Sequence, residues 1–285
     1  MMTMNGLDDK KIIGALRCPL CGEKMRVHRD VSTSIVCEGK RTHCYDVSAS
    51  GYVNLCAPTQ SGGGDAKGAV RSRTAFLDCG YYAPVASALK DVCEKYADKE
   101  NILIDAGCGE GYYSSFFAEA GFSVFGIDLS KFAADAAAKR AKRASYKNAF
   151  FATASVFEIP VFDGTAGVLT NIFAPCAENE FKRVLKDDGV LVVAYAGEEH
   201  LLGLKKAIYE NARVNDGRAD LPLGMTLLEE IRVKYSVTLD SNEKILNLFA
   251  MTPYYWKTSV SDAEKLKGID RLTTDVDIII AAYRK

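Results

Sequence analysis

The feature of this sequence that most restricts its fold is a short apolar run that is followed by alternating glycines. Residues 102–111 read ILIDAGCGEG, so three apolar residues precede Asp105 and the glycines stand at every second position. A run this short and β-branched predicts a buried parallel strand. Glycine permits positive φ and lets the backbone approach a ligand closely. A strand, a glycine turn and a helical pattern, in this order, are typical of an open α/β sheet that binds ligands at the carboxyl edge of its strands.

Two acids accompany the glycine turn. The dinucleotide fingerprint is G-x-G-x-x-G, whereas this chain has D-x-G-x-G-x-G. A carboxylate at Asp105 would repel a pyrophosphate, but it suits a cationic ligand with an amino group and a sulfonium. Asp128 ends the next apolar run, where the hydroxyls of a ribose would lie. The combination resembles motif I of the class I S-adenosylmethionine-dependent methyltransferases, and the alternative is a β–α turn that binds no ligand.

The rest of the core alternates strands and helices. We expect strands at 102–106, 122–127, 149–153, 166–172 and 189–195, and helices at 85–96, 112–120, 131–143 and 177–185. This order predicts a doubly wound α/β sheet. Beyond it we expect a helix at 200–212, an amphipathic segment up to residue 234, a strand at 235–239, a helix at 242–251 and a final strand at 277–283 in an antiparallel edge pair.

The cysteines indicate a metal site. Four of the nine cysteines lie between residues 18 and 44, a crowding that in a reducing compartment favours metal over disulfides. The two-residue gap in Cys18-Pro-Leu-Cys21 places two sulfurs on one ion, and Cys37, His43 and Cys44 are the candidates for a second pair. We favour a closed, structural zinc site formed by Cys18, Cys21, Cys37 and His43, with Cys44 as the rival fourth ligand. So small a segment depends on its metal for stability.

Charge and composition point to three segments. The chain as a whole has a net charge of −1, which gives no general case for nucleic acid. Residues 10–45, however, contain eight Lys or Arg against three acids, an excess that favours contact with phosphates. We therefore expect a zinc-binding module at 1–56, a glycine-rich flexible linker at 57–70 and a methyltransferase domain at 71–285. The absence of a membrane-length apolar run and of a secretory signal predicts a cytoplasmic protein without a membrane partner.

A set of phrases along the chain makes a closer resemblance. They are CPLC at 18–21, SGYVNL at 50–55, SRTAFLDCGYYAPV at 72–85, DAGCGEGYYS at 105–114, IFAPC at 172–176 and MTPYYW at 251–256. In this order the phrases are similar to those of the RlmA family of 23S rRNA (guanine-N1)-methyltransferases. They extend over nearly the whole chain and are more specific than the glycine turn alone.

The resemblance implies a zinc-bearing RNA-recognition module on a class I methyltransferase domain. It implies transfer of a methyl group from S-adenosylmethionine to N1 of one guanine in a hairpin of the large-subunit rRNA, with S-adenosylhomocysteine as the product. It also implies a homodimer whose two halves embrace the RNA. The implied S-adenosylmethionine site consists of Asp105, Gly107, Gly109, Gly111, Tyr112, Asp128, Leu129, Ala154 and Ser155. The implied zinc ligands are Cys18, Cys21, Cys37 and His43, although the gap between the last two is longer than the family's usual three residues. This departure keeps Cys44 open as a ligand.

The chemistry places further demands on the chain. Methyl transfer is an in-line displacement that depends mainly on position and electrostatics. The proton on guanine N1 must leave, yet the sequence names no base. Our hypothesis is that Asn171 and the carbonyls around Pro175 accept from guanine N1–H and its exocyclic amine. Ser155 either reads the adenine through its hydroxyl or only forms a turn, and Cys176 is expected to pack rather than to act as a nucleophile.

Aromatic side chains offer surfaces for an unstacked base. The candidates, each of which can instead belong to the core, are Tyr112, Tyr113, Tyr254, Tyr255 and Trp256. Two other functions compete with rRNA methylation. One is a small-molecule methyltransferase, which would leave the basic zinc module without a role. The other is a non-catalytic RNA-binding protein, against which the intact glycine turn and its two acids argue.

Overall fold

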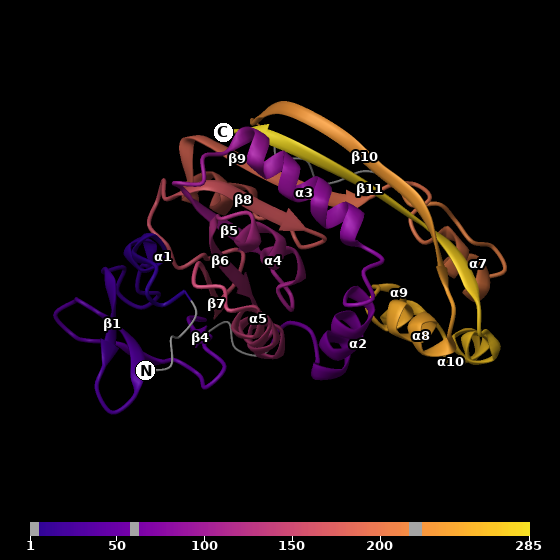
Figure 1. The fold of residues 1–285 in the computed structure, drawn as a ribbon, viewed down its shortest axis with the longest axis horizontal. Helices are drawn as coiled ribbons and strands as arrows, with labels where there is room; N and C mark the ends of the chain where they lie inside the picture. Colours follow the sequence, from indigo (N-terminus) through magenta and orange to yellow (C-terminus); the bar gives the residue numbers. More distant parts are fainter. Residues whose placement is uncertain (1–5, 58–62, 217–223) are drawn as a thin grey trace.

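The computed structural model describes residues 6–57, 63–216 and 224–285. In these ranges one mixed sheet has eight strands, in the order β10-β11-β9-β8-β5-β6-β7-β4 (Figure 1). Its strands are β4 (Val53–Asn54), β5 (Ile102–Ala106), β6 (Ser123–Asp128), β7 (Ala149–Thr153), β8 (Ala166–Ile172), β9 (Leu185–Ala196), β10 (Thr226–Leu239) and β11 (Leu272–Arg284). A second sheet contains β1 (Met25–Arg29), β2 (Thr33–Cys37) and β3 (Cys44–Asp46).

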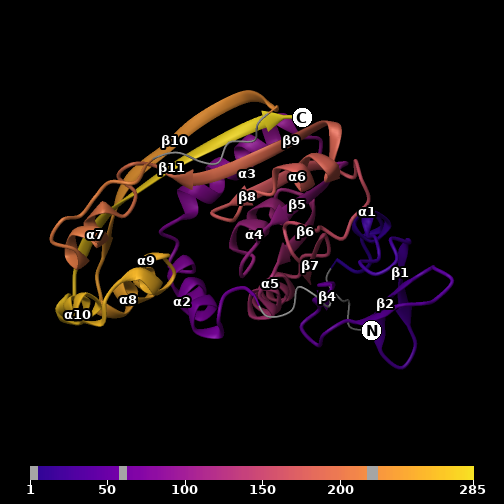
Figure 2. The same cartoon turned by 180° about the vertical axis from the view of Figure 1, so that it is seen from behind.

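Helices cover both faces of the main sheet. They are α1 (Lys10–Ala15), α2 (Lys67–Leu77), α3 (Ala83–Tyr96), α4 (Tyr112–Glu119), α5 (Lys131–Ala144), α6 (Glu178–Val184), α7 (Leu202–Ile208), α8 (Asn242–Ala250), α9 (Tyr254–Lys257), α10 (Val260–Glu264) and the 3₁₀ helix η2 (Lys265–Gly268). The alternation of side chains along each strand divides the core into two clusters. Leu103 of β5 packs under α3 and α4, whereas Ile102 and Ile104 face α1 and α6 on the other side (Figure 2).

The class I methyltransferase fold predicted from the sequence is confirmed. β5, β6, β7 and β8 are buried along nearly their whole length and pair in parallel, as continuous apolar runs require. β11 then runs antiparallel to both β9 and β10 and forms the expected edge pair.

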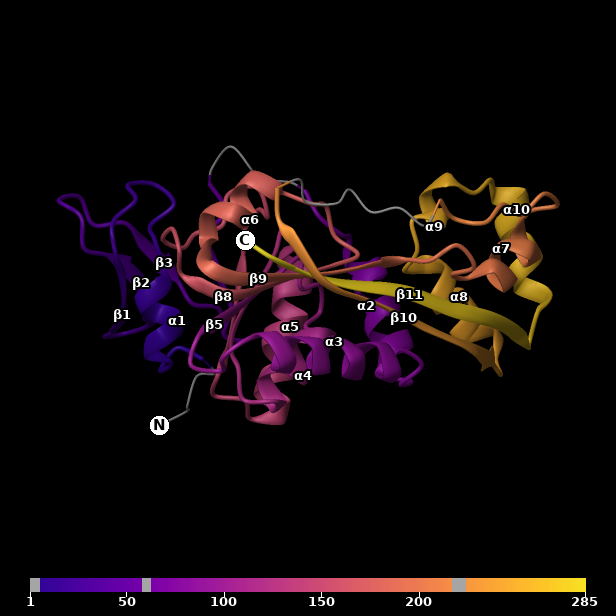
Figure 3. The ribbon, with the colours of Figure 1, turned by 90° about the horizontal axis from the view of Figure 1, so that it is seen from above.

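The N-terminal segment is joined to the methyltransferase sheet. Ile12 and Leu16 are completely buried in the same apolar cluster as Phe125 and Ile127, and β4 adds a parallel strand beside β7. The three-stranded hairpin sheet then projects from the core (Figure 3). The predicted module at 1–56 therefore shares its hydrophobic core with the catalytic fold.

The C-terminal part forms a lobe on a long two-stranded arm. β10 and β11 pair over their full length, and α7, α8, α9, α10 and η2 gather near the far end of this arm (Figures 1 and 3). α8 packs against α2, so the lobe also contacts the segment that precedes the core. The hairpin sheet and the lobe lie at opposite ends of the molecule.

Several sequence-based boundaries were wrong, among them the starts of β9, at Leu185 rather than at residue 189, and of β11, at Leu272 rather than at residue 277. β10 begins at Thr226 rather than at residue 235, because the side chains alternate along an edge strand whose outer face is exposed. The helix predicted at 200–212 is limited to Leu202–Ile208. Residues 58–62 of the predicted linker at 57–70 lie outside the described residues, but Lys67 already begins α2, and Ser130 Oγ donates to Asp65 O at 2.7 Å.

Candidate active site and metal centre

The glycine turn lies at the carboxyl edge of the sheet, between β5 and α4. Gly107, Gly109 and Gly111 all have positive φ, at 85°, 54° and 76°, as the sequence predicted. A Cβ on Gly107 would stand 2.5 Å from the Cβ of Ala174, so the loop after β8 approaches the turn too closely for any side chain there. The turn is fixed to β6 because the Gly107 and Cys108 N–H groups both donate to Ile127 O at 2.9 Å.

Asp105 lies beneath this turn and is 1% exposed. Its two carboxylate oxygens accept hydrogen bonds from Ser114 Oγ at 2.5 Å and from Thr170 Oγ1 at 2.9 Å. Burial raises the pKa of Asp105 to about 6, although both hydroxyls act to lower it. The carboxylate is thus enclosed, so its influence on a ligand passes through the turn above it.

Asp128 ends β6 beside the turn and is partly exposed. Backbone N–H groups hold both of its oxygens: Gly109 N donates to Oδ2 at 3.1 Å, and Ser130 N donates to Oδ1 at 2.8 Å. Burial raises the pKa of Asp128, opposed by these two N–H groups. A carboxylate fixed in this way retains lone pairs for two hydroxyl donors, as a ribose would require.

A charged cluster that was not predicted from the sequence lies over the same turn. Arg73 of α2 forms an ion pair with Asp65, and its Nη1 lies 3.9 Å from Glu110 Oε2. Its Nη1 also lies 3.4 Å from the Cβ position of Gly109. Glu110 is 2% exposed, and its Oε2 makes no hydrogen bond within the described residues. Although burial acts to lower it, these carboxylates raise the pKa of Arg73, so the guanidinium stays charged. An acid inside the glycine phrase was the one local signal of this cluster.

The other predicted cofactor residues surround this turn. Tyr112 begins α4 and is largely buried, with the Arg140 guanidinium 5.7 Å from its ring centroid. Leu129 follows Asp128 and is partly exposed. Ala154 is buried after β7, and its N–H donates to Asp128 O at 3.1 Å. The Ser155 Oγ accepts from the Phe157 N–H at 3.2 Å, so this side chain forms a turn, which is the alternative role predicted for it.

Asn171 and the segment after it form the facing wall. Asn171 is buried, and its Nδ2 donates to Ala106 O at 3.3 Å and to Pro175 O at 3.1 Å. The Asn171 amide therefore ties the end of β5 to the exposed loop after β8. Pro175 lies in that loop, and Phe173 precedes it with almost half of its surface exposed.

Of the aromatic candidates, Tyr112 and Tyr113 lie at the turn, and the others lie in the lobe. Tyr254 OH donates to Asn215 Oδ1 at 3.2 Å, Tyr255 packs on Phe249, and Trp256 is 69% exposed.

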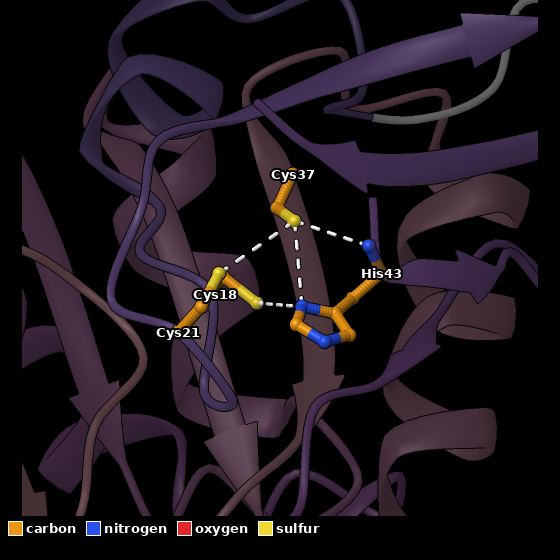
Figure 4. A group of neighbouring side chains, drawn as sticks. All are labelled: Cys18, Cys21, Cys37 and His43. Carbon is orange, nitrogen blue, oxygen red and sulfur yellow. Dashed lines mark hydrogen bonds between the residues drawn. The ribbon is translucent and has the colours of Figure 1, made fainter. Parts of the chain in front are cut away.

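Four predicted ligands come together in the hairpin sheet. The ligand atoms of Cys18, Cys21, Cys37 and His43 all lie within 4.8 Å of one another (Figure 4). Tetrahedral zinc, with Zn–S of about 2.3 Å and Zn–N of about 2.0 Å, needs about 3.8 Å between sulfurs and about 3.5 Å between sulfur and nitrogen. In the structure the sulfurs of Cys21 and Cys37 lie 3.7 Å apart. His43 Nδ1 lies 3.6 Å from the sulfur of Cys18 and 3.5 Å from the sulfur of Cys37.

The protonation of Cys37 and the position of Cys44 agree with this ligand set. Burial raises the pKa of the Cys37 thiol, but hydrogen bonds from the backbone N–H groups of His43 and Gly39 outweigh it and lower that pKa to about 6. A thiolate is the form that binds metal. Cys44 is exposed on β3 and does not belong to the cluster. The donor set therefore fits a closed structural zinc site, and the rival candidate Cys44 lies outside this cluster.

The surface around the metal cluster is basic. Exposed Lys and Arg side chains come from β1 and from the two loops beside the ligands, namely Lys24, Arg26, Arg29, Lys40 and Arg41. Two of them have acidic neighbours, since Arg29 pairs with Asp8 at 2.6 Å and Arg26 lies 3.9 Å from Glu38.

In the described part of the chain, no helix is both long enough and apolar enough to cross a membrane.

Comparisons with known proteins agree with this geometry. A family model described as a methyltransferase domain matches residues 97–250. The YxjB protein of Bacillus subtilis, provisionally assigned as a 23S rRNA (guanine-N1)-methyltransferase, is 32% identical over 93% of this chain and 95% of its own length. The 23S rRNA (guanine(748)-N1)-methyltransferase of Streptomyces fradiae is 29% identical over 95% of this chain and 98% of its own length. A provisionally assigned 23S rRNA (guanine-N1)-methyltransferase of Micromonospora griseorubida is 28% identical over 94% and 97%.

Proposed function

Because the chain belongs to the family of 23S rRNA (guanine-N1)-methyltransferases, we propose that it transfers a methyl group from S-adenosylmethionine to N1 of one guanine in a hairpin of the large-subunit rRNA. The observation that carries this proposal is the match to the relatives over nearly the full chain, including the metal hairpin. When bound, S-adenosylmethionine supplies a methyl group on a positively charged sulfur. A nitrogen lone pair can attack this methyl group, and the sulfur then leaves as part of S-adenosylhomocysteine.

The electrostatics of the turn suit a cationic donor. The carboxyl groups of Asp105, Glu110, Asp128 and Asp65 outnumber the two guanidinium groups beside them, those of Arg73 and Arg140. We propose that Asp128 accepts from the ribose hydroxyls and that Asp105 favours the positive charge through the turn amides. A guanidinium matches a carboxylate with two parallel N–H donors, so Arg73 is proposed to hold the carboxylate of the donor's amino-acid part.

The rest of the donor site follows from backbone access. Gly107, Gly109 and Gly111 leave the backbone of the turn uncovered by side chains of their own. The segment around Ala154 and Ser155 lies beside Asp128, where the adenine attached to that ribose would reach. We propose that backbone amides and the Ser155 hydroxyl read the adenine, with Leu129 and Tyr112 as apolar walls.

Guanine is proposed to meet the donor along the loop after β8. Asn171 is a positioning residue in this scheme, because its amide holds Pro175 O and Ala106 O at fixed separations. The carbonyls of this loop then accept from the guanine N1–H and the exocyclic amine. The N1 proton passes to solvent water during or after methyl transfer, and the loop orients the base for this loss.

The metal hairpin is proposed to bind the rRNA backbone. Zinc, held by Cys18, Cys21, Cys37 and His43, would fix the hairpin that carries the exposed basic side chains. Lys and Arg side chains on a rigid frame supply the sequence-independent part of RNA affinity. A homodimer and a cytoplasmic location, which the resemblance and the rRNA substrate imply, complete the proposal, and sedimentation equilibrium tests the dimer.

The test is methylation of defined RNA by the purified protein. A hairpin of 23S rRNA is incubated with methyl-labelled S-adenosylmethionine, and digested nucleosides are separated. We expect label in 1-methylguanosine only, and none with Asp128→Ala as the inactive control. Label on small molecules but not on RNA would favour a small-molecule methyltransferase, and intact RNA binding without heat from S-adenosylmethionine in calorimetry would favour a non-catalytic binder.

A further inference from the structure

The segment after β8 contains a strained residue with an exposed ring. Phe173 has φ 54°, a region that a bulky side chain rarely adopts. Its N–H still donates to Ala194 O at 3.1 Å, so the strain begins directly after the last rung of the sheet. Among the described residues the two other non-glycine residues with positive φ are Ser145, which ends α5, and Leu201, which is 2% exposed. Phe173 is 47% exposed, so its backbone strain is not explained by burial of the ring.

Neighbouring rings fix the orientation of Phe173. The His200 imidazole lies parallel to it, with an interplanar angle of 8° and ring centroids 6.3 Å apart, and Tyr113 lies 6.4 Å away on α4. His200 is itself held, since the Asp277 N–H donates to its Nδ1 at 3.3 Å and Tyr82 OH lies 3.3 Å from its Nε2. Burial lowers the pKa of His200 to about 4, so an uncharged ring supports Phe173 at neutral pH.

The position of Phe173 relates it to the methyl donor. Ala174, its neighbour in the chain, would be in contact with any Cβ on Gly107 of the glycine turn. An acceptor base must approach the donor at this edge of the sheet. N1 lies on the Watson–Crick edge of guanine, so a paired and stacked guanine has to leave its stack before N1 is reachable. The unstacked base then loses aromatic contact on its faces, which a protein ring can replace.

We propose that Phe173 is the platform on which the target guanine stacks while its N1 faces the methyl donor. The inference rests on the proposed function and adds to it the residue that positions the base. The strained backbone holds the ring at the sheet edge, and His200 and Tyr113 set its plane. In this scheme Phe173 contacts the base first, and the loop that Asn171 anchors contacts it afterwards.

Four substitutions at one position test this role, with the rRNA hairpin as substrate. Phe173→Ala removes the ring, and Phe173→Leu keeps an apolar side chain without a π face. Phe173→Tyr restores the ring, and Phe173→Gly removes it while relieving the backbone strain. Leu227→Ala, at a 52% exposed site on edge strand β10, is the matched control for loss of an exposed apolar side chain. For each variant we measure kcat/KM, the Kd for S-adenosylmethionine and the melting temperature.

The proposal predicts a distinct pattern. Phe173→Ala, Phe173→Leu and Phe173→Gly lower kcat/KM by about 5-fold to 150-fold, the range that loss of one base–aromatic stack produces. Phe173→Tyr and Leu227→Ala stay near wild type, and the Kd for S-adenosylmethionine is unchanged throughout. Phe173→Gly melts above Phe173→Ala, because glycine adopts positive φ freely, and yet it is equally impaired.

Other results overturn the inference. Wild-type kcat/KM in Phe173→Leu would show that stacking is not used. A matching loss of S-adenosylmethionine affinity would assign the ring to the donor site instead. Recovery of activity in Phe173→Gly would mean that backbone geometry, and not the ring, is what matters. A wild-type protein that forms no 1-methylguanosine would instead refute the proposed function, and this inference with it.

Discussion

Replacing Asp105 with asparagine tests whether the buried carboxylate under the glycine turn carries an unfavourable charge. Burial raises its pKa from 3.8 to about 6. At 1.36 kcal/mol for each pKa unit, this shift means that ionising Asp105 costs about 3 kcal/mol more in the folded protein than in the unfolded chain. In unfolded chains the carboxyl loses its proton near pH 4, whereas in the folded protein it keeps the proton up to about pH 6. Its contribution to stability is therefore fully present below pH 4 and is lost as pH rises through 6.

Asp105→Asn has no charge to lose across this window. The free energy of unfolding of the variant minus that of wild type is therefore expected to increase by about 2 kcal/mol from pH 4 to pH 7, which is most of the full difference. Urea unfolding of both proteins at a series of pH values measures this difference, in which all other titrating groups cancel. A difference in free energy of unfolding that stays constant with pH would refute the claim that burial makes ionisation of the Asp105 carboxyl unfavourable.

The same substitution has a functional consequence. An ionised Asp105 attracts a cationic donor, so Asp105→Asn is expected to bind S-adenosylmethionine more weakly than wild type at pH 8. Below pH 6 the wild-type carboxyl is itself neutral, and the two affinities are expected to converge. Calorimetric titration at pH 8 and below pH 6 measures the ratio of the two affinities for S-adenosylmethionine. A ratio that does not change with pH would mean that Asp105 acts only on structure.

Further substitutions and metal removal test the other parts of the site. Arg73→Met is expected to raise the Kd for S-adenosylmethionine about 10-fold to 100-fold in calorimetry, through loss of a charge-assisted hydrogen bond. Asn171→Ala is expected to lower turnover about tenfold with little change in that Kd, and unchanged turnover would remove it from the proposal. Cys37→Ala, or a zinc chelator, is expected to lower the melting temperature and abolish rRNA binding, whereas exposed Cys44→Ala leaves both unchanged. Lys40→Ala is expected to reduce the slope of log affinity against log salt by about one in filter binding.

Local patterns in the sequence were sufficient for much of the core. The bounds of β5, β7 and β8 match the predicted strands, because buried parallel strands are short apolar runs between turns. The four Cys and His residues that cluster in the hairpin sheet were also identified, since chelation imposes its own spacing. β10 was placed too late, although apolar residues at every second position, from Ile231 to Leu239, were a usable signal for a longer strand.

The remaining features depend on contacts between distant segments. β4 joins the sheet because β7 pairs with it, and a two-residue strand carries no periodic pattern. Arg73 lies over the glycine turn because α2 begins within an otherwise glycine-rich stretch and directs this side chain onto the core. Phe173 has positive φ in a loop whose next residue, Ala174, lies against Gly107 of the glycine turn, and composition cannot show such a contact between distant segments.

Primer extension on 23S rRNA tests the central claim most directly. A methyl group on N1 blocks the Watson–Crick edge of guanine, so reverse transcriptase stops at the modified residue. We predict one stop in a hairpin of the rRNA from wild-type cells, no stop in cells that lack the gene, and recovery of the stop when the wild-type gene, but not one encoding Asp128→Ala, is returned. A pattern of stops that is the same with and without the gene would contradict the account.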